Sequence, residues 1–144
     1  MAVRVKIRIE VRNLKKIVES SALVNTGFET ERPQLLIPRK LAELLGLWPP
    51  PREAEVTVLG TAGGPSRMYL IKDGLNVSIL VDGIAKNETI SDILISDIEE
   101  EVLINDKLGE ELGIVIEKMV SGEWRLSTDS PNVRRKTEKP EYWR

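Results

Sequence analysis

Asn25, Thr26 and Gly27 form a short polar turn directly after the apolar residues 22–24. A strand that ends in this way presents a small polar side chain at a fixed place, with Gly27 free to take a positive φ angle and Thr26 able to hydrogen-bond nearby backbone. The side chain of Asn25 is a neutral amide that cannot pass on a proton near pH 7. Taken alone, the triplet is typical of a structural Asx turn.

The absence of two residue types limits the chemistry of this chain. The 144 residues contain no Cys and no His. These absences exclude a disulfide framework, a thiol nucleophile, Ser-His-Asp chemistry and a zinc site with imidazole or thiolate ligands. A hydrolase built from this sequence has to use carboxylates, Lys, Ser or Thr, or a metal bound by carboxylates.

Other candidate sites are weaker. The acidic segment 97–101 is typical of an exposed loop and fits no EF-hand spacing, so no metal and no cofactor are expected. Asp106 stands where a helix start favours negative charge, and Gly63-Gly64 lacks the Lys of a phosphate loop. Trp48 and Trp124 are expected in the core or at a dimer contact. The net charge of −2 gives no general attraction to nucleic acid.

The elements that must position the turn are mostly strands. Apolar and charged residues alternate over 3–11, which predicts a half-buried strand, and Pro38 and Gly46 delimit a short helix with Leu41, Leu44 and Leu45 as its apolar face. Asn105 or Asp106 is expected to cap a second helix. The predicted strands are 3–11, 17–24, 54–59, 67–71, 75–81, 90–95, 102–104, 114–116 and 124–126, and the helices are 38–45 and 106–112.

This order predicts a mainly β fold, a small closed β barrel with two short helices. No βαβ alternation suggests a parallel sheet. A strand–turn–helix rhythm at 22–46 and again at 102–113 is compatible with internal duplication, and 114–116 with 124–126 would close the sheet. We expect one domain over 1–127 and a polar, mobile C-terminal tail over 128–144 that buries little. No signal peptide or membrane-spanning stretch is seen, which favours a cytoplasmic protein without a membrane partner.

The order of these motifs resembles that of the retropepsin-like (retroviral-type) aspartic proteases. Those proteins carry an apolar strand, an Asp-[Ser/Thr]-Gly turn, a loop, an apolar-Pro step and a helix. Residues 23–27 and 36–47 follow this pattern except that Asn25 stands in the place of the Asp. Residues 102–113 resemble the family's second strand, turn and helix, with Asn105 where Gly is usual, a residue that tolerates left-handed geometry. The resemblance covers roughly residues 3–126.

The resemblance implies a homodimer, because this chain carries one such turn where two-lobed relatives carry two. It implies that Asn25, Thr26 and Gly27 of each protomer meet across a two-fold axis, and that Thr61, Ala62, Gly63 and Gly64, at the tip of a hairpin over 60–66, cover an extended peptide. With Asp at both positions, two carboxylates about 3 Å apart would share one proton and activate a water. Asn25 therefore predicts the fold of an aspartic endopeptidase without its hydrolytic step.

Three interpretations stay open on the sequence. Asn25 is either an engineered change in a working protease or a natural feature of a pseudo-protease that binds peptides or serves for dimerisation. The third interpretation is a monomeric β barrel with no ancestral link to proteases.

Overall fold

The computed structural model describes residues 2–61 and 63–144, and within them the chain is mainly β with two short helices. The strands are β1 (Arg4–Val11), β2 (Ile17–Val24), β3 (Gln34–Pro38), β4 (Glu55–Thr61), β5 (Gly64–Val81), β6 (Ile84–Ser96), β7 (Val102–Ile104), β8 (Ile114–Lys118), β9 (Glu123–Leu126) and β10 (Arg135–Lys136). The helices are α1 (Arg39–Leu44) and α2 (Asp106–Glu111). None of the described helices is long and apolar enough to cross a membrane.

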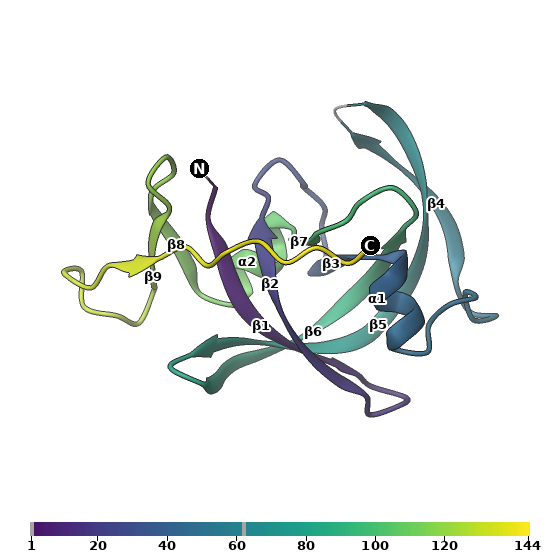
Figure 1. Ribbon diagram of the computed structural model, residues 1–144, viewed down its shortest axis with the longest axis horizontal. Helices are drawn as coiled ribbons and strands as arrows, with labels where there is room; N and C mark the ends of the chain where they lie inside the picture. Colours follow the sequence, from purple (N-terminus) through teal and green to yellow (C-terminus); the bar gives the residue numbers. More distant parts are fainter. Residues whose placement is uncertain (1, 62) are drawn as a thin grey trace.

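Six strands close into a barrel, as the sequence predicted (Figure 1). Their order is β1-β2-β7-β3-β6-β5, and pairing of β5 with β1 completes the ring. The inside is apolar because side chains of a strand alternate between its two faces. In β1, Val5, Ile7, Ile9 and Val11 are buried and the charged residues between them are half-buried, so the predicted alternation is confirmed.

The barrel consists of two similar halves. The first half is β1, β2, β3 and α1, and the second is β5, β6, β7 and α2, in the same order along the chain. Each half contains one antiparallel pair, β1–β2 or β5–β6. Parallel pairs β2–β7 and β3–β6 join the halves, with the antiparallel pair β3–β7 between them. This arrangement is what an approximate internal two-fold axis would produce.

The amino-acid sequence carries the same duplication. When residues 35–47 are placed over 102–114, seven of the thirteen positions are identical. The identical pairs are Leu36/Leu103, Ile37/Ile104, Lys40/Lys107, Leu41/Leu108, Glu43/Glu110, Leu45/Leu112 and Gly46/Gly113. Gly46 and Gly113 both have positive φ, 77° and 79°, and each ends a helix as predicted. The repeated unit therefore comprises a strand and the helix that follows it.

The strand predictions need five corrections, of which the first is that β6 begins at Ile84 and not at residue 90. β3 was not predicted as a strand, and the two parallel pairings were not expected. Residues 67–71 and 75–81 belong to one long strand, β5. β8 and β9 do not close the barrel but form a separate sheet with β10. In α1 the apolar face is Leu41, Ala42 and Leu45, because Leu44 is 58% exposed. Trp48 and Trp124 both pack with the core, as predicted.

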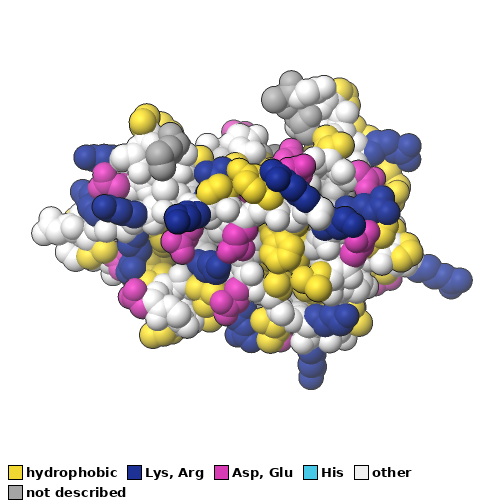
Figure 2. Space-filling view, viewed as in Figure 1, with side chains coloured by type: hydrophobic (Ala, Val, Ile, Leu, Met, Phe, Trp, Pro, Cys, Tyr) yellow, Lys and Arg dark blue, Asp and Glu magenta, His cyan; other side chains and the backbone are white. Residues whose placement is uncertain are grey.

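The segment 128–144 was expected to be a mobile tail that buries little; its residues are exposed or half-buried, but it makes specific contacts with the barrel. It runs across β1 and β2, as the yellow trace in Figure 1 shows. The N–H of Glu138 donates to the carbonyl of Arg4 at 2.8 Å, and Lys6 forms an ion pair with Glu141 at 2.8 Å. Trp143 packs against the core and its Nε1–H donates to Ser20 Oγ at 3.0 Å. On this face basic and acidic side chains are interspersed (Figure 2).

Replacing Trp143 with alanine is expected to lower the free energy of unfolding by about 2 kcal/mol, because a half-buried indole and its hydrogen bond are both lost. Tyr142→Ala is the matched control, since Tyr142 is 50% exposed and its replacement should cost less than about 0.5 kcal/mol. Urea denaturation of both variants measures the difference. Equal losses would mean that Trp143 does not hold the segment in place.

Candidate functional site

The turn at Asn25 begins where β2 leaves the barrel. The N–H of Asn25 donates to the carbonyl of Ile104 in β7 at 2.9 Å, and Asn25 Oδ1 accepts the N–H of Gly27 at 3.1 Å. This is the Asx turn that the sequence suggested. Two expectations are corrected. Gly27 is not among the glycines with positive φ, and the Thr26 hydroxyl has no hydrogen-bond partner among the described residues.

A groove of about 540 Å³ lies on one side of this turn. Asn25 and Gly27 line it from the turn, and Leu59 and Gly60 line it from β4. Its floor is a second apolar cluster, separate from the barrel interior, formed by Leu36, Met68, Leu94 and Leu103 with Leu23, Phe28, Leu59 and Leu70 packed against it. The groove lies between the barrel and the β4–β5 hairpin, and the polar residues Asn25, Glu29, Thr30 and Glu99 line it together with apolar ones.

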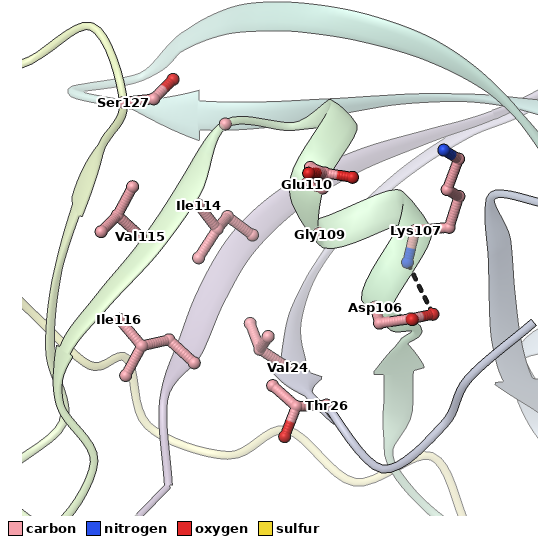
Figure 3. Close-up of a pocket in the computed structure, with 11 residues that line it drawn as sticks. Val24, Thr26, Asp106, Lys107, Gly109, Glu110, Ile114, Val115, Ile116 and Ser127 are labelled. Carbon is pink, nitrogen blue, oxygen red and sulfur yellow. Dashed lines mark hydrogen bonds between the residues drawn. The ribbon is translucent and has the colours of Figure 1, made fainter.

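A second hollow lies on the other side of the turn, where Thr26 is exposed. It is bounded by α2 and by β8, with Val24 and Thr26 facing Ile114 and Ile116 across it (Figure 3). β8 pairs only with β9 among the described residues, so one of its edges is open. The apolar residues of β8 are half-buried rather than covered. The open edge strand β8 and the exposed residue Thr26 therefore line the same hollow.

The internal repeat places a second turn opposite the first. Val24 pairs with Ile104 in one parallel pair, and Ile37 pairs with Ile95 in the other. Because Ile37 matches Ile104 in the repeat, Ile95 is the counterpart of Val24. The residue after Ile95 is therefore the structural counterpart of Asn25.

That counterpart is Ser96, which is fully buried. Ser96 Oγ accepts hydrogen bonds from the N–H groups of Ile98 at 3.2 Å and Glu99 at 3.1 Å. Asn25 holds the N–H of Gly27 in the same manner, so both turns begin with a side-chain oxygen that caps the following backbone. The second turn carries no carboxylate at its first position. A single chain therefore has only Asn25, and not its counterpart Ser96, at the position where the resemblance expects a catalytic aspartate.

Asn105 holds the segment that follows the first turn. Its Oδ1 accepts the N–H of Gln34 at 3.0 Å and of Leu108 at 2.9 Å. Its Nδ2 donates to Thr30 Oγ1 at 2.8 Å and to the carbonyl of Arg32 at 2.9 Å. The predicted cap of α2 is confirmed, but left-handed geometry is not, since φ of Asn105 is −77°. Its amide is buried and has four partners.

An ion pair between the half-exposed Arg32 and the buried Asp92 anchors the same segment to β6. Arg32 donates from Nε and Nη2 to the two oxygens of Asp92, both at 2.8 Å, and Asp92 also accepts from Gln34 Nε2 and the N–H of Asp73. Burial alone would raise the pKa of Asp92. The hydrogen bonds from Arg32, Asp73 and Gln34 outweigh burial and hold the pKa below its ordinary value of 3.8.

This ion pair predicts a loss of stability in acid. Because the folded-state pKa of Asp92 is lowered, its contribution is present above pH 3.8 and is lost as the pH falls through the folded value. The free energy of unfolding should therefore decrease on acidification below pH 3.8. Asp92→Asn should be less stable at pH 7 and lose less in acid. Denaturation at pH 7 and below pH 3.8 tests this, and parallel losses in the two proteins would contradict it.

The acidic segment 97–101 is largely occupied by ion pairs. Glu101 pairs with Arg4, Glu100 with Arg144 at 2.8 Å, and Asp97 lies 3.5 Å from Arg39. Among the described residues no group of three or more His, Cys, Asp or Glu is placed to hold a metal ion. Glu99 has no ion pair among the described residues, and it lines both the groove beside Asn25 and a hollow bordered by Arg39, Lys40 and Arg144.

The predicted flap residues lie on the β4–β5 hairpin. Thr61 pairs with Gly64, so the strands extend further than expected and the tip is shorter than 60–66. Gly63 stands in the turn, and Ala62 lies outside the described residues. Gly60 is the hairpin-tip residue that lines the groove.

Some groove residues were missed by the sequence analysis. Phe28, Glu29 and Thr30 follow the turn directly and line the groove, and Glu99 comes from the opposite turn. Phe28, Glu29 and Thr30 could have been predicted from the sequence, because they directly follow the turn. No local signal identifies Glu99, because its position depends on how β6 and β7 cross.

Comparison with known proteins gives no independent assignment. No protein-family model and no curated protein matches this chain.

Proposed function

We propose that this chain is one protomer of a homodimeric, retropepsin-like aspartic endopeptidase, inactive as written because Asn25 occupies the position of the catalytic aspartate. The observation that carries the proposal is the position of the turn. Asn25 and Gly27 face an apolar groove below a hairpin, while Thr26 faces an open strand edge. A peptide site on one side and a subunit contact on the other fit a shared active site.

Dimerisation follows from the incomplete site. The counterpart of Asn25 within the chain is the buried Ser96, so a second position-25 side chain has to come from a second copy. The exposed Thr26 hydroxyl is then available to hydrogen-bond the partner's turn. The open edge and the apolar side chains of β8 give the second copy a surface to pair with.

An aspartate at position 25 of both protomers would complete the chemistry. Two neighbouring carboxylates cannot both ionise, so one stays protonated and polarises the scissile carbonyl while the other takes a proton from water. Peptide binding does not need the carboxylates. An extended substrate would place apolar side chains over the cluster of Leu36, Met68 and Leu103 and add its backbone to the hairpin.

Asn25 itself favours a second candidate function. If Asn is the natural residue, the same groove belongs to a pseudo-protease that binds extended peptides or serves as a dimerisation unit. The test that separates the candidates is Asn25→Asp, whose gain of peptide cleavage supports the protease. Cleavage by neither protein, with peptide binding by both, supports the binding module.

A further inference from the structure

The groove beside Asn25 carries two carboxylates among its apolar walls. Glu29 lies on the segment after the first turn and Glu99 lies on the opposite turn, so the two enter the groove from different elements. Among the described residues, no Lys or Arg lines the groove. The charged residues that line it are therefore both acidic, while its floor is apolar.

These two carboxylates differ from their neighbours in having no charge partner. Glu101 and Glu100 form ion pairs with Arg4 and Arg144, at the side of the loop that faces the C-terminal segment. Among residues 2–61 and 63–144, neither Glu29 nor Glu99 has an ion pair. Glu99 also borders a hollow lined by Arg39, Lys40 and Arg144, but its carboxylate forms no ion pair with them, so two carboxylates without an ion pair line the binding groove.

The backbone fixes the position of Glu99. Its N–H donates to the buried Ser96 Oγ, and the carbonyl of Glu100 accepts the N–H of Trp143 at 2.7 Å. The loop is therefore held on both sides of Glu99. Glu29 is followed by Thr30, whose hydroxyl accepts from the buried amide of Asn105. Both carboxylates thus stand on backbone that is tied to the barrel.

We infer that Glu29 and Glu99 determine substrate specificity and that the groove prefers peptides with an apolar residue flanked by Lys or Arg. The inference depends on the proposed function, because it concerns what that same groove binds. In an extended peptide the side chains at i and i+2 share a face. An apolar side chain over Met68 and Leu103 therefore brings a basic residue within two positions to these carboxylates. The dimer would present both carboxylates from each protomer.

Peptide binding to the chain as it exists tests this inference, because Asn25 leaves the peptides uncut. The probes are three fluorescein-labelled peptides with a shared Leu-Phe centre and with Lys, Gln or Glu flanks. By fluorescence anisotropy at low salt, the Lys-flanked peptide should bind about tenfold more tightly than the Glu-flanked peptide. Added salt should reduce that ratio, since exposed charges are screened.

Three variants assign the effect to residues. Glu29→Gln and Glu99→Gln should each reduce the ratio about threefold. Glu111→Gln, an exposed residue of α2 outside the groove, should leave it unchanged. The inference is overturned if all three peptides bind with equal affinity, or if the ratio of affinities is the same in both groove variants as in the unmodified chain. In either case, peptide binding itself still supports the proposed function. If no peptide binds and Asn25→Asp cleaves none, the proposed function falls and the inference falls with it.

Discussion

Asn25→Asp is expected to give this chain a peptide-cleaving activity at least about 10³-fold above that of the chain as written. The change replaces a neutral amide with a nearly isosteric carboxylate that can take and return a proton. The surrounding turn needs no rearrangement, because Asn25 Oδ1 already accepts the N–H of Gly27 and an aspartate oxygen can do the same. The missing component is the proton-transfer group alone.

The measurement is cleavage of a mixed peptide library between acid and neutral pH, followed by mass spectrometry. Activity should pass through a maximum with pH, since one carboxylate of the pair has to be protonated and the other ionised. A transition-state mimic of the pepstatin type should block it. Asn25→Ala is the control, because it changes the same side chain without supplying a carboxylate.

Sedimentation separates the two ways in which this prediction can fail. A variant that folds and dimerises yet cleaves no peptide contradicts the protease proposal directly. A variant that remains monomeric at micromolar concentration contradicts the shared site, because Ser96 cannot take the place of the second carboxylate. A monomer would instead favour a barrel unrelated to proteases.

The parts of the fold that could be predicted from sequence are those with a local signal. β1 has an unbroken period of two, and a strand with one face in the barrel requires that pattern. β2 was predicted where it occurs. The helix-ending Gly46 and Gly113 are also local signals.

The parts that were missed depend on distant contacts. β3 is a five-residue run buried along its whole length, and a short apolar run of this kind does not distinguish strand from helix. Its parallel pairing with β6 arises because the two halves of the barrel interlock, which no local pattern encodes. Trp143 shows the same limit, since one aromatic residue in a polar tail fixes the tail only if a matching surface exists on β2.

The candidate site likewise contains residues that could be predicted from the sequence and residues that could not. Asn25, Thr26 and Gly27 were identified from the sequence and do lie together at the end of a barrel strand. Glu99 was grouped with an exposed acidic loop, because its neighbours are charged and the crossing of β6 and β7 is not visible in the sequence. Asn105 was recognised as a helix cap, but its contacts to the segment after the first turn were not.

Asn105→Ala is expected to lower the free energy of unfolding by about 3 kcal/mol. The change removes the cap of α2 and leaves buried donors and acceptors of the neighbouring backbone without partners. Asp106→Ala is the control at the same helix end, because Asp106 is exposed and its loss should cost about 0.5 kcal/mol. Chemical denaturation measures both values.

The same substitution also bears on how the site is built. Asn105 connects α2 to Thr30, Arg32 and Gln34, which follow the turn that carries Asn25. If the buried amide positions that turn, Asn105→Ala in an Asn25→Asp background should reduce cleavage beyond what the unfolded fraction explains, because the carboxylate would no longer be held in place. Full activity per folded molecule would show that the barrel strands alone position the turn and that Asn105 contributes only stability.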